Sequence, residues 1–144
     1  EVAALAPHAT ICLLTALQVH GLTTESPHAV WIMIDTRARR PNLASPPLEV
    51  VRAHGAPRKH GVELRKVEGV TVRITSPAKT VADCLRYRRH VGLDVALAAI
   101  KDYIVKGRQR SRGARDYTSD ALANAAKVDR VYGVLRPYLE ALVA

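Results

Sequence analysis

The sequence predicts an α+β fold in which a small, mainly antiparallel sheet in the first half is covered by helices from the second half. Residues 62–67 and 70–74 alternate apolar and polar side chains around Glu68-Gly69, which is the pattern of a β-hairpin. Residues 30–34 form a continuous apolar run of strand length. In the second half, apolar residues recur at helical spacing. Strands followed by helices in a chain of this length indicate a single α+β domain over residues 1–144.

The first half contains one predicted helix and two further strands. Residues 10–20 are apolar on nearly every side and end at Gly21, a typical residue after a helix C-terminus, so we expect a central core helix. Residues 30–34 lack the alternation of a half-exposed strand and are expected inside the sheet. Residues 48–53 form the next strand. Residues 36–47, which contain several arginines and prolines, form an exposed connection.

A strand-to-helix corner follows the hairpin. Ser76 is a favourable N-cap, and Pro77 suits the first position of a helix. The helix that follows, residues 77–89, presents an apolar stripe to the core. The stripe consists of Ala78, Val81, Ala82 and Leu85.

Three more helices are predicted after this corner. They cover residues 93–107, 119–128 and 131–142, and Pro137 is expected to bend the last of them. Residues 107–116, between the first two, form a basic loop that contains two glycines.

Charge is distributed unevenly along the chain. It has 22 Lys and Arg residues against 13 Asp and Glu residues, a net charge of +9. The first 36 residues contain three acids and no basic residue, so residues 37–144 carry a net charge of +12. This asymmetry indicates an anionic partner, with nucleic acid as the leading candidate. The alternative is a solvated basic surface without a partner, because few aromatic residues accompany the charges.

Several observations bear on location and cofactors. Cys12 and Cys84 lie in apolar helical contexts and are expected to be buried free thiols, which is consistent with a reducing cytoplasm. No apolar run reaches the ~18 residues of a membrane helix, and residues 1–20 lack a signal-peptide pattern, so a cytoplasmic protein without membrane association is expected. The histidines show no metal-ligand spacing, and no catalytic or cofactor motif is present. We therefore predict no metal, no cofactor and no catalytic residue.

Two clusters of arginines are the candidate nucleic-acid-binding residues. Guanidinium groups match phosphate geometry, and a loop that contains glycine can follow a nucleic-acid backbone. The alternative for both clusters is ordinary solvated surface. The candidates are Arg86, Arg88 and Arg89 in the corner helix, near Lys79, and Arg108, Arg110, Arg112 and Arg115 in the basic loop.

Lys79 and Asp83 are the candidate protein-contact residues. They stand four positions apart on one helix face, with Arg86 nearly one turn further on. This face is interpreted either as a contact surface for a second protein or a second protomer, or as an ordinary ion pair within the helix. A third interpretation is that Asp83 holds a neighbouring loop or strand by hydrogen bonds.

A nuclease-like enzyme is a weaker alternative. Asp35 at a strand end and Glu63 with Arg65 in a later strand have some likeness to the metal-binding acids of restriction-type nucleases. Such enzymes hold their acids and a lysine together beside Mg²⁺. Here an arginine stands in place of the lysine, and the interpretation requires Asp35 and Glu63 to lie within about 6 Å in a cleft.

The chain resembles the bacterial AbiEi antitoxin family over nearly its whole length. The order and spacing of several short motifs carry this resemblance, and none of them forms a catalytic set. They are Leu14-Thr-Ala-Leu17 with His20-Gly21, Trp31, Gly61-Val62, Gly69-Val70, Ser76-Pro-x-Lys79-Thr80-x-x-Asp83 and Arg136-Pro-Tyr-Leu139.

The resemblance implies a function for the chain. AbiEi-like proteins are antitoxins and transcriptional autorepressors of type IV toxin–antitoxin systems, in which the partner is a nucleotidyltransferase toxin. They usually begin with a winged helix-turn-helix that reads operator DNA, and no such domain fits ahead of Ala9. We therefore expect a C-terminal antitoxin domain, present here as a fragment and not itself an enzyme. The alternative is a DNA-binding or dimerisation module of a plain transcriptional regulator.

Overall fold

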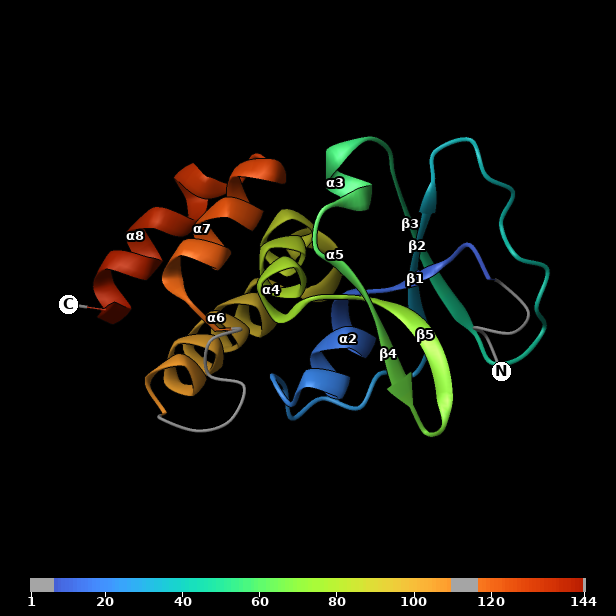
Figure 1. Ribbon diagram of the computed structural model, residues 1–144, viewed down its shortest axis with the longest axis horizontal. Helices are drawn as coiled ribbons and strands as arrows, with labels where there is room; N and C mark the ends of the chain where they lie inside the picture. Colours follow the sequence, from blue (N-terminus) through green and yellow to red (C-terminus); the bar gives the residue numbers. More distant parts are fainter. Residues whose placement is uncertain (1–6, 110–116, 144) are drawn as a thin grey trace.

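The computed structural model describes residues 7–109 and 117–143 and has an α+β fold, with a five-stranded sheet beside a group of helices (Figure 1). The α+β class predicted from the sequence is confirmed. The strands lie side by side in the order β3-β2-β1-β5-β4. Their bounds are β1 Thr10–Ile11, β2 Val30–Asp35, β3 Leu48–Ala53, β4 Val62–Val67 and β5 Val70–Thr75.

The sheet is mixed, so the expectation of a mainly antiparallel sheet was wrong. β1 pairs antiparallel with β2, and β4 with β5, whereas β1–β5 and β2–β3 are parallel pairs. Parallel neighbours need a crossover of about a dozen residues or more. The segment 36–47 between β2 and β3 has this length and contains no helix. It carries the chain back to the end of the sheet at which β2 begins, so that β3 runs parallel to β2. The sequence showed this segment only as a connection.

The central strand β1 was also missed. Thr10 and Ile11 were expected in a helix that began at residue 10, but they pair with β2 on one side and with β5 on the other. Helix α2 begins only at Leu13 and runs through Leu13–His20. Gly21, the residue that follows the helix, has φ 69°, as the predicted helix end requires. The apolar character of residues 10–12 suits a buried strand as well as a buried helix, and pairing with the sheet decided between them.

The predicted hairpin is confirmed. β4 and β5 pair from Val62–Thr75 to Val67–Val70, with Glu68 and Gly69 as the two-residue turn. Both turn residues have positive φ, 51° for Glu68 and 82° for Gly69. Two positive φ angles are typical of the type I′ turns that match the twist of paired strands.

The corner after β5 also has the predicted structure. The Ser76 side chain accepts a hydrogen bond from the backbone N–H of Lys79, and Pro77 opens α4, Pro77–Arg86. The helix ends at Tyr87, and a separate short helix α5, Arg88–Val91, follows it. The single helix expected over residues 77–89 is thus two helices.

The remaining helices follow the predicted order, with one addition. The short α3 after β3 was not expected from the sequence. Pro137 lies inside the last helix. The bounds are α3 Ala56–Lys59, α6 Leu93–Arg108, α7 Ser119–Val128 and α8 Tyr132–Val143.

Helix α4 lies at the centre of the main core. It contacts α2, α6 and α7, and its Val81 and Leu85 are fully buried. Met33 of β2 and Val51 of β3 belong to the same core, so the helices cover this face of the sheet. The covering layer includes α2 from the first half as well as the helices of the second half (Figure 1).

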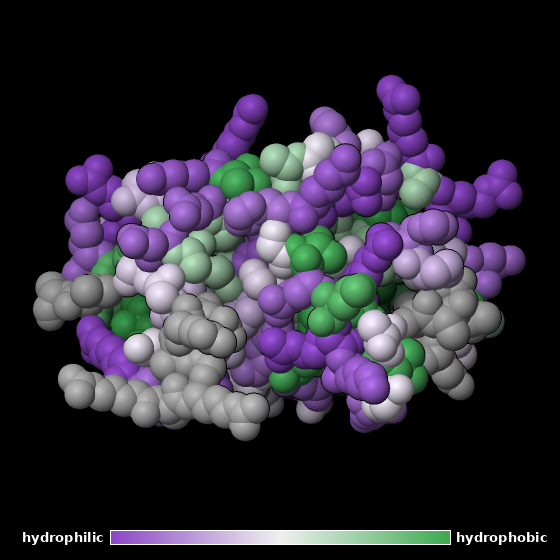
Figure 2. Space-filling model, viewed as in Figure 1, coloured by the Kyte–Doolittle hydropathy of each residue, from purple (hydrophilic) through white to green (hydrophobic). Residues whose placement is uncertain are grey.

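A smaller core lies on the opposite face of β2 and β3. Ile32, Ile34 and Leu48 are buried there, and Ala38 and Leu43 of the segment 36–47 pack against them. The segment predicted to be an exposed connection therefore also covers apolar surface. The other described surface is mainly hydrophilic on the face shown in Figure 2, with hydrophobic side chains in small patches. None of the helices in the described ranges has the length and hydrophobicity needed to cross a bilayer.

Candidate functional site

Three buried charged side chains meet between α4 and the end of α7. Lys79, Asp83 and Asp129 are 1%, 0% and 3% exposed. The Lys79 ammonium forms an ion pair with Asp83 one turn further along α4 and lies 3.1 Å from Oδ1 of Asp129. Charged groups are rarely buried this deeply unless they are paired, and this cluster satisfies that condition.

The end of α7 determines the position of Asp129. Helix α7 stops in a Schellman motif, in which the N–H of Val131 donates to the carbonyl of Ala126 at 2.8 Å and the N–H of Arg130 donates to that of Lys127 at 3.1 Å. Arg130 takes the left-handed conformation that the motif requires, with φ 59°. Asp129 is the last residue before this reversal, and its side chain is therefore directed back to α4.

The cluster binds a proton more tightly than separate residues would. The pKa of Asp83 is raised well above its usual value, first because the carboxyl is buried and then because it approaches the carboxyl of Asp129. Burial opposes the charge on Lys79, but the two aspartates outweigh it and raise the pKa of Lys79. Asp83 therefore keeps its proton to a higher pH than an ordinary aspartate, and Lys79 keeps its charge to a higher pH than an ordinary lysine.

The burial of Lys79 and Asp83 corrects one interpretation. Neither side chain is exposed, so they do not form the contact surface for a second protein that the helix spacing suggested. The alternative, an ion pair within α4, is what the structure shows, and Asp129 extends it to α7. No signal in the sequence linked Asp129 to this pair, because residues far apart in the chain meet only through the packing of α4 and α7.

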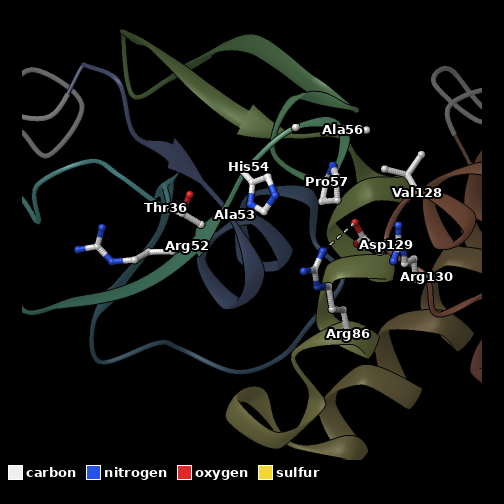
Figure 3. A pocket seen from close by; sticks show the side chains of 11 residues that line it. Thr36, Arg52, Ala53, His54, Ala56, Pro57, Arg86, Val128, Asp129 and Arg130 are labelled. Atoms are coloured by element: carbon white, nitrogen blue, oxygen red, sulfur yellow. Dashed lines mark ion pairs between the residues drawn. The ribbon is translucent and has the colours of Figure 1, made fainter.

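A pocket of about 710 Å³ opens beside this cluster, between the β3–α3 connection and the ends of α4 and α7 (Figure 3). Its floor includes Asp129, and Arg86 lies beside it with Nη1 at 3.9 Å from Oδ1 of Asp129. The pocket is lined by Thr36, Arg52, Ala53, His54, Gly55, Ala56, Pro57, Arg86, Val128, Asp129 and Arg130.

The arginines of the corner helix are used in different ways. Arg86 is partly buried and lies over the ring of Tyr87, 5.4 Å from its centroid. Arg88 donates to the carbonyl of Leu85 at 2.7 Å, which stabilises the end of α4. Arg89 is exposed. The cluster predicted to contact nucleic acid therefore presents Arg89 to solvent, whereas Arg86 and Arg88 also make contacts within the fold.

The second predicted cluster is described only in part. Arg108 is exposed and donates to the carbonyl of Leu142 at 3.1 Å, joining the end of α6 to α8. Arg110, Arg112 and Arg115 lie outside the described residues.

The acids of the nuclease interpretation do not meet. Asp35 lies on β2 and Glu63 on β4, with β1 and β5 between them. Three strand spacings amount to roughly 14 Å, well beyond the distance that a shared metal ion requires. Asp35 pairs instead with Arg58 at 3.2 Å, and Glu63 pairs with Arg65 at 3.3 Å. Within the ranges that the structure describes, no group of three or more His, Cys, Asp or Glu residues is arranged to hold a metal ion.

The two cysteines and His20 are buried inside the fold. Cys12 and Cys84 are both buried and free, as the sequence suggested. His20 is buried, and its Nε2–H donates to the carbonyl of Thr75 at 2.8 Å. A carbonyl only accepts, so Nε2 carries the proton, and Nδ1 faces Arg65 at 3.4 Å.

Comparison of the chain with protein-family models and with curated proteins gave no match.

Proposed function

We propose that the chain is the C-terminal domain of an AbiEi-like antitoxin and autorepressor of a type IV toxin–antitoxin system. The domain acts in the cytoplasm without chemistry of its own and without a cofactor. It counteracts a nucleotidyltransferase toxin, and an N-terminal winged helix-turn-helix supplies operator recognition. Direct contact with the toxin is not part of the proposal, because type IV antitoxins act without a stable complex.

The observation that carries the proposal is the role of the motif residues at the corner. Gly61 lies so close to α4 that an added Cβ would approach Cβ of Lys79 to 2.6 Å. Its carbonyl accepts the N–H of Ser76 at 2.6 Å. Motif residues from two separate segments, Gly61-Val62 and Ser76 to Asp83, thus form one tightly packed unit.

Thr80 of the same motif completes the corner. Its hydroxyl lies 3.1 Å from the carbonyl of Thr75 and 2.7 Å from that of Ser76, and it is fully buried. These contacts hold the end of β5 against the start of α4. The motif is therefore architectural, and this supports a domain that acts through its surface rather than through catalytic side chains.

The charge of the surface supports a contact with nucleic acid. Arg89 is exposed at the end of the corner, and Arg108 is exposed at the end of α6. Such residues add affinity for the phosphate backbone without reading sequence. They would strengthen the binding of a winged helix to its operator.

A second candidate is a DNA-binding or dimerisation module of a regulator without a toxin. The net charge of +12 after residue 36 favours it equally, because that charge favours an anionic partner and implies no toxin. An adjacent nucleotidyltransferase gene supports the antitoxin, and its absence supports the plain regulator.

Growth rescue tests the proposal. Cells that express the neighbouring nucleotidyltransferase should recover when the antitoxin is supplied, with and without its N-terminal domain. Asp35→Asn and Glu63→Gln should still rescue, provided that circular dichroism shows folded protein. Leu85→Ala should fail through loss of folded protein, because truncating a fully buried leucine costs about 2–5 kcal/mol. A folded Asp35→Asn or Glu63→Gln variant that no longer rescues would contradict a non-enzymatic antitoxin.

A further inference from the structure

Strand β4 forms one edge of the sheet, and within the described residues β5 is the only strand that pairs with it (Figure 1). The carbonyl of Gly61, just ahead of β4, accepts the N–H of Ser76, just after β5. In an antiparallel ladder every second residue directs its backbone groups to the same neighbour, so the odd-numbered residues of β4 face β5. The even-numbered residues direct their N–H and C=O groups outward, where a further strand can pair with them. These residues are Val62, Leu64 and Lys66.

The middle of this edge presents an apolar side chain to solvent. Leu64 is 72% exposed, the largest fraction among the large hydrophobic side chains that the structure describes. Its neighbours Glu63 and Arg65 lie on the α2 side of the sheet, where Nη1 of Arg65 is 3.4 Å from Nδ1 of His20. Leu64 therefore points to the opposite side of the sheet. Outward backbone groups together with an uncovered leucine are the features that strand addition between chains uses.

The sequence of β4 is complementary to its own copy. Consider two antiparallel β4 strands related by a two-fold axis at Leu64. Each Leu64 then faces its equivalent, and Glu63 faces the partner's Arg65 on both sides of the axis. Val62 faces the partner's Lys66, so that no like charges stand opposite each other.

The charges also select this register. An axis at Glu63 or at Arg65 would place two like charges directly opposite each other, which is destabilising. Charged side chains on an edge strand usually discourage pairing with other strands. In β4 the same charges fit a second copy of the strand in one alignment.

We propose that two copies of the chain associate through β4 as a symmetric antiparallel pair centred on Leu64. The pairing joins the two sheets into one continuous sheet. The pair of Glu63 and Arg65 within each chain, 3.3 Å apart, becomes part of a group of two acids and two arginines across the axis. Both copies use the same edge, so the association stops at a dimer. The inference does not rest on the antitoxin function, and it gives the dimerisation alternative a specific interface.

Sedimentation equilibrium of the 144-residue chain tests the proposal. A single strand pair is smaller than the interfaces of stable complexes, so we expect a Kd of about 10–100 µM. The average mass should rise from that of one chain to that of two between about 5 and about 500 µM.

Two leucine variants test the centre of the interface. Leu64→Glu should weaken dimerisation about tenfold, because two carboxylates then meet at the axis. Leu93→Glu is the matched control, since Leu93 is also exposed, at 44%, but opens α6, and it should leave the Kd unchanged. Circular dichroism at about 5 µM, where the wild type is mainly monomeric, should show that both variants are folded.

A charge exchange tests the register. Glu63→Arg and Arg65→Glu should each weaken self-association at least about fivefold, because like charges then face each other on both sides of the axis. An equimolar mixture of these two variants should associate about as tightly as the wild type, because opposite charges meet again in the mixed dimer.

The proposal is overturned if the chain remains monomeric at about 500 µM, if it forms assemblies larger than a dimer, or if Leu64→Glu dimerises as tightly as the wild type. It is also overturned if the mixture of Glu63→Arg and Arg65→Glu associates no more tightly than either variant alone.

Discussion

The ammonium group of Lys79 lies 3.1 Å from the carboxylate of Asp129 and so links the central helix α4 to the C-terminal end of α7 inside the core. Asp83, on the same helix as Lys79, completes the cluster. Three ionisable groups without access to solvent are stable only as a set, because each one compensates the cost of burying the others. This set fixes the position of α7 relative to the sheet–helix corner.

Replacing Lys79 by methionine should strongly destabilise the domain. The change removes the cation and leaves two buried carboxyl groups facing each other, which is expected to cost about 3–5 kcal/mol. Urea denaturation followed by circular dichroism measures this loss as a lower midpoint with an unchanged slope.

The exposed pair Arg136–Glu140 provides the matched control. Its groups are also four residues apart on a helix and lie 2.8 Å apart, but its side chains are 66% and 65% exposed. Arg136→Met should leave the urea midpoint essentially unchanged. If Lys79→Met and Arg136→Met lowered the urea midpoint by the same amount, burial would not explain the contribution of the Lys79–Asp83 pair to stability.

Substitution of Gly61 by alanine should disrupt the corner. Gly61 has φ 73°, and an added Cβ would meet Cβ of Lys79 at 2.6 Å, so both backbone strain and a clash are expected. Gly69→Ala is the comparison, because Gly69 has φ 82° but open space around its Cβ position. Gly61→Ala should cost about 1–3 kcal/mol more than Gly69→Ala. Thermal unfolding of the two variants measures the difference, and similar melting temperatures would show that the packing against Lys79 is not tight.

Stability should depend on pH through His20. Burial lowers the pKa of His20 below its ordinary value of 6.5, with Arg65 and Lys106 adding to the effect and the contact with Thr75 opposing it. Between the lowered pKa and 6.5, the folded protein binds fewer protons than the unfolded chain, so stability falls as the pH falls through this window.

The comparison of two histidine variants isolates this contribution. In His20→Gln, the side-chain amide still donates to Thr75 but cannot be protonated, so the loss of stability between about pH 7.5 and about pH 5.5 should be smaller than in the wild type. His60→Gln, at an exposed position, should retain the full loss. Urea denaturation at the two pH values gives the result, and an undiminished loss in His20→Gln would place the pH dependence elsewhere.

Arg89 should contribute to weak, sequence-independent DNA binding. The isolated domain should bind duplex DNA with an affinity that decreases with salt, and Arg89→Gln should reduce the log–log slope by about 0.9 if this residue neutralises one phosphate. Fluorescence anisotropy over a range of salt concentrations measures the slope. Removal of Arg108, Arg110, Arg112 and Arg115 together should flatten it further. A slope that none of these substitutions changes would mean that the arginines are solvated surface.

Local pattern predicted those parts of the fold that local interactions control. The Glu68-Gly69 turn, the Ser76 cap and the end of α2 at Gly21 each depend on residues within a few positions, and the structure confirms all three. Helices α6 and α7 also follow their apolar spacing. The predicted helix 77–89 ended early at Tyr87, because helix ends depend on packing as well as on spacing.

Strand direction and the buried cluster required the tertiary structure. The sequence by itself determined an α+β fold, the hairpin, the corner and a strongly basic chain after residue 36. It did not determine that Thr10 and Ile11 form the centre of a mixed sheet, or that Asp129 joins Lys79 and Asp83 beside a basic pocket. Turns and caps are set by the conformational preferences of neighbouring residues, whereas strand pairing and ion pairs between helices depend on which distant segments pack together.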